Sequence, residues 1–494
     1  MTGVSARILD SLLSDWRGTS TLGVPAPATG MPAYSALADR IRLLILDGRI
    51  QVGARLPAER DLAQRLGVSR TTITSTYAEL RASGYLTSQR GSGSIAGLPG
   101  LPGRPVAMAE AEASTMLDLS KAALPATPLL ADAAVRAAQQ LPAYLGETGF
   151  DPVGLPRLRQ AIADRYTARG LPTEPGQVMV TIGAQHAIAL LSRVLLHRGD
   201  AALVESPSYP HAFEALRAAG GRLVPVGVST DDGWDDDALE QALQRSSPAL
   251  AYLMPDFHNP TGRVMDAATR ERLLDLAGRQ GTVVIADETM AELDIDFGER
   301  PLPLAAYGGD GGPGAVSAST VLVGSFGKTV WGGVRIGWLR AAPALIQKLV
   351  RARPAGDLGT PILEQLIAID LLGHYDEVLE LRREQLRRGR DHLEAALARE
   401  LPEWNVPHVH GGLTVWAGLG HPVSSQLTMA ARGEGLLLAS GPRFGIDGAF
   451  ERFLRIPFSH TPEETDRAIA ALARAWASLT RHSLTDQEYL AEVV

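Results

Sequence analysis

The apolar residues at the start of the chain recur at helical spacing and predict a short amphipathic helix. Within residues 1–17, one face of this helix would carry Ile8, Leu9, Leu12, Leu13 and Trp16. A helix of this length is marginal alone in water, so we expect it to pack on its own chain or on a dimer mate. Its polar face is not basic, which disfavours a role at a membrane surface. Small residues and prolines follow, and this N-terminal helix and its linker together span residues 1–30.

Residues 31–96 predict three helices and then a two-stranded wing. We expect the second helix to hold Pro57 in its first turn, where a missing backbone N–H costs little. Gly67 makes the turn into the third helix, and Ser69 is placed to cap that helix. In chain order the three helices and the hairpin are expected near Ser35–Asp47, Leu56–Leu66, Arg70–Ser83 and Tyr85–Ile95.

This second segment differs in charge from the rest of the chain. Residues 31–100 hold nine arginines and five acidic residues, a net charge of +4. The rest of the chain must therefore carry −12 to give the total net charge of −8. A basic module on an acidic body is typical of nucleic-acid binding, although a solvated basic face would give the same charge. The outward N-terminal end of the third helix is where a recognition helix meets DNA. The candidate DNA contacts are Arg60, Ser69, Arg70, Thr71, Thr72, Arg90 and Gly91.

The rest of the chain predicts an α/β domain. Residues 97–116 form a linker rich in Gly, Pro and Ala, and the large domain follows over 117–494. From Val178 to about Ala341, runs of Val, Ile and Leu alternate with helical stretches, which predicts a mostly parallel sheet covered on both faces. A long charged helix near Asp376–Leu397 opens a small C-terminal α+β subdomain, about 376–494. Representative strands are expected at Ala201–Val204, Leu250–Met254, Val283–Ala286 and Thr320–Gly324.

One lysine stands out between glycines at a strand end. The chain uses arginine for nearly all of its basic residues, and its lysines are Lys121, Lys328 and Lys348. Unlike arginine, a desolvated lysine amine can lose its proton and form a Schiff base. The stretch Val321–Trp338 alone leaves two interpretations of Lys328 open, a surface loop lysine and a reactive amine.

The surrounding motifs favour the second interpretation. Ser325-Phe-Gly-Lys328, followed by Arg335, resembles the cofactor-lysine motif of fold-type I pyridoxal 5'-phosphate (PLP) enzymes, the aspartate aminotransferase family. Upstream, in that family's order, come a glycine-rich turn, a loop with an aromatic residue, an asparagine turn and a strand that ends in aspartate. These four motifs are Thr181–His186, Glu205–Pro210, Asn259–Gly262 and Thr282–Asp287.

The resemblance implies a role for each motif residue. Lys328 would hold PLP as a Schiff base, and Asp287 would keep the pyridine nitrogen protonated so that the ring withdraws electrons. Asn259 would bond the cofactor's phenolate oxygen, and Tyr209 would stack on the ring. The phosphate would lie at a helix N-terminus. Its ligands would be Gly183, Ala184, Gln185, Ser325 and Arg335.

A substrate or effector carboxylate would meet Arg455 in the Phe453–Pro457 stretch, since its planar guanidinium suits a carboxylate. A surface or ion-paired arginine is the alternative. Two positions depart from the family pattern. Thr289 stands where the family places a tyrosine on the phenolate oxygen, and Phe150 where a tyrosine is often found nearby. His186 and Glu288 are expected in the core or behind the site.

The N-terminal module resembles the winged helix-turn-helix of the GntR family over its whole length. The motifs that carry the resemblance are Leu56–Arg60, Leu66–Thr72 and Arg90–Gly93. Fused to an aminotransferase-like domain, it makes the chain similar to the MocR subgroup of GntR regulators. That resemblance implies a transcription factor that binds operator DNA as a head-to-tail homodimer. Its effector would be PLP, an amino compound that forms an external aldimine with PLP, or both.

Two other functions stay open. The chain could be a working aminotransferase with an appended DNA-binding module, or a DNA-binding protein whose large domain only dimerises. We expect little efficient transaminase turnover, because Thr289 cannot supply the phenol that tunes the cofactor. The chain has no Cys, which excludes thiolate metal sites and suits a reducing cytoplasm, and no metal site is predicted. No apolar run reaches the length of a membrane span, and no signal peptide is expected.

Overall fold

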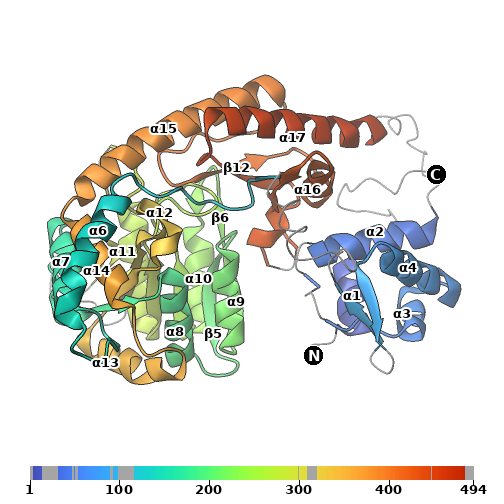
Figure 1. The fold of residues 1–494 in the computed structure, drawn as a ribbon. Helices are drawn as coiled ribbons and strands as arrows, with labels where there is room; N and C mark the ends of the chain where they lie inside the picture. The colour runs from blue at the N-terminus through green and yellow to red at the C-terminus, as the bar shows by residue number, and fades with distance from the viewer. Residues whose placement is uncertain are drawn as a thin grey trace.

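The structure is a computed structural model in which an N-terminal domain, a large α/β domain and a smaller C-terminal domain follow one another (Figure 1). The predicted fold class, a winged helix-turn-helix joined to a mostly parallel α/β domain with a small C-terminal α+β part, is confirmed. The residues that the structure describes are 4–13, 32–46, 49–50, 54–89, 93–97, 116–298, 300–308, 320–446 and 448–483.

The N-terminal domain contains the three predicted helices and the wing. The second helix begins later than predicted, so Pro57 precedes it. The carbonyl of Pro57 accepts a bond from Tyr77 Oη at 2.9 Å, and Leu56 N bonds Ser94 O at 2.9 Å, which keeps this stretch extended. The elements are α2 Ala33–Leu46, α3 Glu59–Leu66, α4 Arg70–Ala82, β1 Leu86–Gln89 and β2 Gly93–Ala96.

The first helix, α1 Ala6–Leu13, packs on this domain within its own chain. Leu9 and Leu13 are fully buried in the core of the N-terminal domain. Asp10 accepts a bond from Arg65 of α3 at 2.7 Å. The prediction that Ile8 shares the buried face is wrong, since Ile8 is 52% exposed. Trp16 lies outside the described residues.

An eight-stranded sheet forms the centre of the large domain, in the order β4–β11–β10–β9–β8–β5–β6–β7. The strands from β10 to β6 pair in parallel, whereas β11 and β7 run antiparallel to their neighbours. The strands are β4 Val178–Thr181, β5 Ala201–Ser206, β6 Arg222–Ser229, β7 Gly233–Trp234, β8 Leu250–Leu253, β9 Val283–Asp287, β10 Thr320–Ser325 and β11 Gly337–Arg340.

Helices cover both faces of this sheet, because successive strand residues alternate between two buried clusters. Ala202 and Val204 face one cluster, and Leu203 faces the other. The helices are α6 Leu130–Gln140, α7 Pro156–Ala168, α8 Ala184–Leu195, α9 Pro210–Ala218, α10 Asp236–Ser246, α11 Ala267–Gln280, α12 Phe326–Thr329, α13 Pro343–Ala352 and α14 Ile362–Leu372. Short 3-10 turns are η1 Leu141–Tyr144, η2 Pro175–Gln177, η3 Leu304–Tyr307, η4 Gly332–Val334 and η5 Arg353–Ala355.

The small C-terminal domain also takes in the first residues after the linker. Strand β3, Leu117–Asp118, pairs in parallel with β13, Leu436–Leu437, so this segment joins a domain that the sequence placed at 376–494. The long helix α15 lies over both domains in Figure 1. The other elements are α15 Tyr375–Glu400, β12 Thr414–Gly418, α16 Ser424–Gly433, β14 Ala439–Ser440, η6 Gly441–Phe444, β15 Phe453–Pro457 and α17 Pro462–Ser483.

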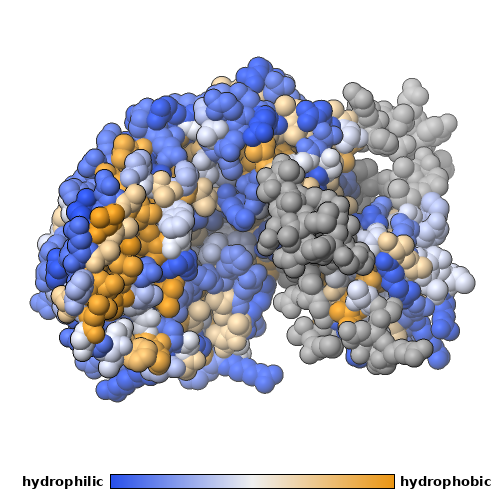
Figure 2. Space-filling model, viewed as in Figure 1, coloured by the Kyte–Doolittle hydropathy of each residue, from blue (hydrophilic) through white to orange (hydrophobic). Residues whose placement is uncertain are grey.

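Apolar side chains gather on the surface over α6 and α14 (Figure 2). The chain from α6 to the loop before α7 contributes Val135, Leu145 and Phe150, which are 59%, 70% and 67% exposed. Among the described residues, no helix is long and apolar enough to cross a membrane.

Candidate functional site

Lys328 lies on α12, the short helix that follows the central strand β10. Ser325 caps this helix, because its Oγ accepts a bond from Gly327 N at 3.0 Å and donates one to Ile336 O at 3.1 Å. The Lys328 Nζ atom donates to the carbonyl of Ala122 at 2.5 Å. The turn therefore aims the amine at the segment that follows β3.

The surroundings of Lys328 make its amine easy to deprotonate. Burial, the largest cause, and the positive charge of Arg455 together lower the pKa of Lys328 to about 8, although Asp287 acts in the opposite direction. An amine with this pKa is neutral in about one molecule in ten at pH 7, far more often than an ordinary lysine. A neutral amine is the form that attacks a carbonyl carbon.

Asp287 ends β9 and is 2% exposed. Its Oδ2 accepts a bond from Tyr252 Oη at 2.6 Å, and its Oδ1 accepts one from Thr289 N at 3.0 Å. Burial raises the pKa of Asp287, although both hydrogen bonds and Lys328 oppose the rise. Tyr252 was missed in the sequence. Its one signal there is a phenol inside the otherwise apolar strand Leu250–Leu253.

Asn259 opens the turn that continues to Gly262, and it is 6% exposed. Its Oδ1 is buried without a hydrogen-bond partner among the described residues. Tyr209 lies just before α9, and burial together with Asp287 raises the pKa of Tyr209 to about 12. Asn259 thus has hydrogen-bonding capacity that the protein leaves unused.

A turn with close backbone packing precedes α8. Gly183 has a φ of 81°, and a Cβ on it would lie 2.8 Å from an Arg335 nitrogen, so a side chain there would block the turn. Arg335 donates to the carbonyl of Ile182 at 2.9 Å. Ala184 begins α8, and Gln185 donates to the carbonyl of His211 at 3.0 Å, while its buried Oε1 has no partner in the described part of the chain. Helix amides and one arginine therefore meet where an anion would be stabilised.

Arg455 lies on β15 and is 6% exposed. It donates to the carbonyl of Ser120, and its guanidinium carbon lies 4.8 Å from the ring centre of Phe444. Burial lowers the pKa of Arg455 to about 10. Its Nε lacks a hydrogen-bond partner, and it forms no ion pair within the part of the chain that the structure describes. These contacts fit neither a surface arginine nor an ion-paired one.

A cavity of about 430 Å³ lies next to this arginine. Its lining includes Ser120, whose carbonyl Arg455 contacts, and four basic side chains. Tyr85 of the N-terminal domain also lines it. The basic side chains are Lys121, His211, Arg432 and Arg443.

His186 and Glu288 lie behind the site, where the sequence placed them. His186 Nε2 is 2.8 Å from Asp357 Oδ2, and its Nδ1 accepts a bond from Ile182 N at 3.2 Å. Glu288 pairs with Arg169 at 3.3 Å. Both side chains hold parts of the large domain together.

Four of the predicted DNA contacts, Ser69 to Thr72, lie at the N-terminal end of α4, and Arg60 lies on α3. Ser69 caps α4 by accepting a bond from Thr72 N at 3.0 Å, and its Oγ lies 2.7 Å from Thr71 Oγ1. Arg60 and Arg70 are exposed, and neither forms an ion pair with another described residue. Arg90 and Gly91 lie outside the described residues. Exposed cations without acidic partners are available to phosphates and base edges.

Comparison with known families agrees with this division of the chain. Residues 116–472 match the family described as aminotransferase class I and II. Residues 33–95 match the gntR family of bacterial regulatory proteins.

Relatives of two kinds are similar to the chain. The 2-aminoadipate transaminase of Thermus thermophilus is 35% identical over 306 residues, which cover 60% of this chain and 75% of that protein. The probable rhizopine catabolism regulatory protein MocR of Rhizobium meliloti is 31% identical over 440 residues, which cover 82% of this chain and 86% of that protein. The crystal structure of LysN, an α-aminoadipate aminotransferase from Thermus thermophilus, matches with a TM-score of 0.67 and 32% identity, covering 76% of this chain and 95% of that one.

Proposed function

We propose, from the premise that this chain belongs to the MocR subgroup of GntR-family transcriptional regulators, that its large domain binds PLP and senses an amino compound. Whether the effector is bound to the large domain would then determine how the N-terminal domains bind operator DNA. The observation that carries the proposal is the environment of Lys328, whose buried amine is influenced by the charges of Arg455 and Asp287 and has a pKa of about 8.

The described residues fit PLP. Lys328 supplies an amine for the cofactor's aldehyde, and the carboxylate of Asp287 suits a protonated ring nitrogen. The Asn259 amide, whose Nδ2 would donate to an oxygen of the cofactor, and the turn at Gly183 offer groups for an oxygen and a phosphate. When bound, PLP supplies an aldehyde that condenses with amines and a ring that withdraws electrons. Tyr252 would fix the Asp287 carboxylate toward the ring through its 2.6 Å bond.

The effector that these contacts favour is an amino acid. Arg455 is buried, keeps a free Nε and has no acidic partner among the described residues, so a carboxylate would satisfy it. The neighbouring cavity of about 430 Å³ is lined by Lys121, His211 and Arg443, which favours a ligand with a further anionic group. Carboxylate binding would also offset the charge with which Arg455 lowers the pKa of Lys328.

The DNA-binding form would be a homodimer, in the head-to-tail arrangement that the fold family implies. The exposed apolar side chains of Val135, Leu145 and Phe150 support an interface over α6 and α14, because patches of this kind mark contact surfaces. Two copies would present two α4 helices to two half-sites of an operator. The effector would act by a population shift, binding one arrangement of these helices better than another.

The test is a footprint of the full-length protein on the DNA upstream of its own gene. We expect protection of a repeated site, and a change in affinity of about 5- to 150-fold when PLP and the right amino acid are added, the usual range for coupled sites. Protection of no site, or affinities unchanged by PLP and by every amino acid of a full panel, would reject the proposal.

A second function, transamination, is favoured by one observation, the 35% identity to a transaminase over 306 residues. Against it, Thr289 stands where a phenol would tune the cofactor, and its backbone N–H bonds Asp287 instead. We propose that turnover stays well below about 1 s⁻¹, the low end for ordinary enzymes. Multiple-turnover assays of keto-acid formation across amino donors and acceptors decide this, and tens of turnovers per second would favour the enzyme.

A further inference from the structure

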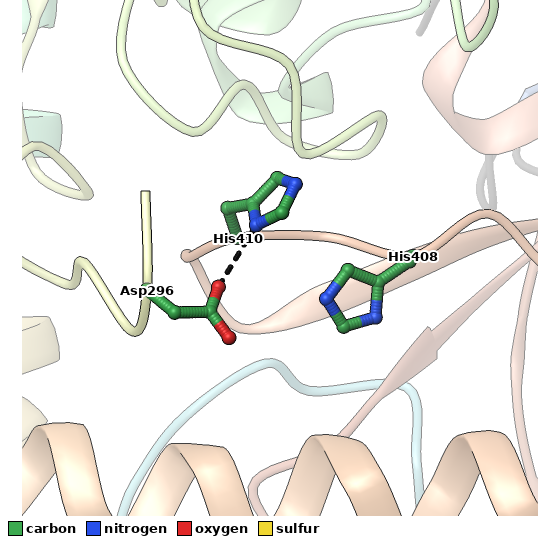
Figure 3. Close-up of side chains that lie close together, drawn as sticks. All are labelled: Asp296, His408 and His410. Carbon is green, nitrogen blue, oxygen red and sulfur yellow. Dashed lines mark hydrogen bonds and ion pairs between the residues drawn. The ribbon is translucent and has the colours of Figure 1, made fainter. Parts of the chain in front are cut away.

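A cluster of two histidines and an aspartate lies away from Lys328, where two distant segments pair. His408 and His410 come from the segment before β12, and Asp296 comes from the loop after β9 (Figure 3). Their potential ligand atoms all lie within 4.8 Å of one another. All three side chains are exposed, so an ion and its water ligands can reach them.

The backbone places these side chains together. His408 and His410 flank Val409, which is 3% exposed, so both imidazoles leave the extended chain on the side opposite the core. Asp294 pairs with Gly411 in an antiparallel bridge, and the backbone N of Ile295 donates to His410 O at 2.9 Å. The two segments are thus joined before any ion binds.

We propose that Asp296, His408 and His410 form a site for a divalent transition-metal ion of the Zn²⁺ or Co²⁺ class. Two imidazoles and one carboxylate, with water in the fourth position, make a ligand set that these ions favour. His410 Nδ1 and Asp296 Oδ1 are 2.9 Å apart. Two ligands on one tetrahedral Zn²⁺ lie about 3.3 Å apart, since each bond is about 2.0–2.1 Å, so a small side-chain shift admits the ion.

Outer contacts orient the ligands. His408 Nδ1 lies 2.9 Å from Glu394 Oε2, so a proton on Nδ1 would leave Nε2 free for the metal, and Figure 3 shows an edge of this ring turned toward Asp296 and His410. Arg390 Nη2 lies 2.8 Å from Asp296 Oδ2, on the oxygen that does not meet His410. A carboxylate held in this way can still bind a metal through its other oxygen.

The charges around the proposed metal site favour a dication, although arginine side chains also lie nearby. Two guanidiniums lie near the cluster, because Arg387 donates to Ile295 O at 3.0 Å, but each also has another acidic partner, Asp391 for Arg390 at 2.8 Å and Glu384 for Arg387 at 3.4 Å. Glu394 adds a further acid, and Arg390 additionally holds the loop by donating to Val409 O at 2.9 Å. With both histidines neutral, the two arginines and the carboxylates of Asp296, Asp391, Glu384 and Glu394 sum to −2.

The bound ion would tie the large domain to the small one. Val409 packs against the turn at Gly262, where an added Cβ would lie 2.5 Å from a Val409 methyl. The strap 408–410 therefore backs the same turn that carries Asn259. Stiffening this strap is the expected structural effect of the ion.

The test uses full-length, tag-free protein that has been stripped with a chelator and dialysed. We expect calorimetry with Zn²⁺ to show one site per chain with micromolar or tighter affinity, and Co²⁺ to give the visible absorption of a low-coordinate site. His408→Ala and His410→Ala should each weaken binding at least about tenfold, and Asp296→Asn should also weaken it. The control is His197→Ala, because this exposed imidazole pairs with Asp200 and belongs to no metal-ligating cluster among the described residues.

Circular dichroism and thermal unfolding of each variant check that it folds. If His410→Ala does not fold, Asp296→Asn, which keeps the volume of the side chain, decides in its place. Absence of saturable Zn²⁺ binding below about 1 mM would overturn the proposal, because that is weaker than any assembled structural site. Binding that the ligand variants and the control reduce equally would overturn it as well.

Discussion

The pKa of Lys328 determines how much of its amine is in the neutral form that reacts with a carbonyl group. Burial and the charge of Arg455 lower it to about 8, against 10.5 for an ordinary lysine. At pH 7 this shift raises the neutral fraction of the amine from about one in three thousand to about one in ten. Cofactor-free Lys328 should therefore react with acylating reagents faster than an unperturbed lysine of equal access, by up to about 300-fold, because a less basic amine is also less nucleophilic.

Two substitutions should move this pKa in opposite directions. Arg455→Gln removes a like charge, which at an effective dielectric constant of about 20 contributes on the order of 1 kcal/mol. The pKa should rise by somewhat less than one unit, and the reactivity at neutral pH should fall about fivefold. Asp287→Asn removes the group that raises the pKa, so the reactivity of Lys328 should increase.

Competitive labelling with acetic anhydride and peptide mapping measures these changes across a pH series. The chain has an internal standard, because Lys121 and Lys348 are its other lysines. Lys121 is exposed and pairs with Asp118 at 2.8 Å, so it serves as the surface reference for the labelling. Equal titration of the three lysines, or a shift of Lys328 in the same direction in both variants, would refute the electrostatic reasoning.

Four further outcomes follow from the same contacts. Lys328→Met should stabilise the cofactor-free protein at pH 7 by up to about 3 kcal/mol in urea unfolding. Burial depresses the folded-state pKa of Lys328, so the wild type is destabilised by the buried charged amine below pH 8. This destabilisation disappears as the pH rises toward 10.5. Arg70→Ala should weaken operator binding by about 1–3 kcal/mol in a gel-shift titration, if Arg70 reads a base edge, whereas Arg217→Ala on α9 should have no effect. Arg455→Gln should retain PLP absorbance but abolish the spectral and DNA-binding responses to amino acids, and unchanged responses would remove the carboxylate assignment. Tyr252→Phe should lower PLP affinity measured by fluorescence quenching by about 0.5–1.5 kcal/mol, the usual net value of one hydrogen bond, because Asp287 loses its 2.6 Å partner.

The sequence predicted the fold class well because its signals are local. Alternating strands and helices imply a parallel sheet, and the motif residues fall at strand ends, as the structure shows for Asp287 on β9 and Ser325 on β10. The error at Pro57 had a different cause. The bonds that keep this stretch extended come from Tyr77 and Ser94, and helix propensity contains no information about such distant partners.

The features that the sequence did not reveal depend on contacts between distant segments. Tyr252 and Asp287 are 35 residues apart and meet only because their strands are neighbours. Asp296 and His410 are separated by 114 residues, and a spacing pattern of histidines alone does not identify an acidic partner so far away. The contact of Arg455 with Ser120 likewise requires that residues just beyond the linker return to the small domain.

The described contacts also connect the candidate effector pocket beside Arg455 with the DNA-binding domain. Arg49, which follows α2, donates to Gly448 O at 3.0 Å and lies 3.6 Å from Glu451 Oε1. The chain then enters β15, where Phe453 stacks on Trp416 at 5.4 Å and Arg455 follows two residues later. One short segment therefore carries the contact to the DNA-binding domain at one end and the candidate carboxylate ligand at the other. A ligand that binds Arg455 equally well in every position of this segment cannot shift the equilibrium between those positions. Only a ligand with different affinities for two positions changes their populations. Under the proposed function, the regulatory signal would therefore be a difference in the position of residues 448–455 between the free and the liganded states, and the contact of Arg49 would pass that difference to the DNA-binding domain.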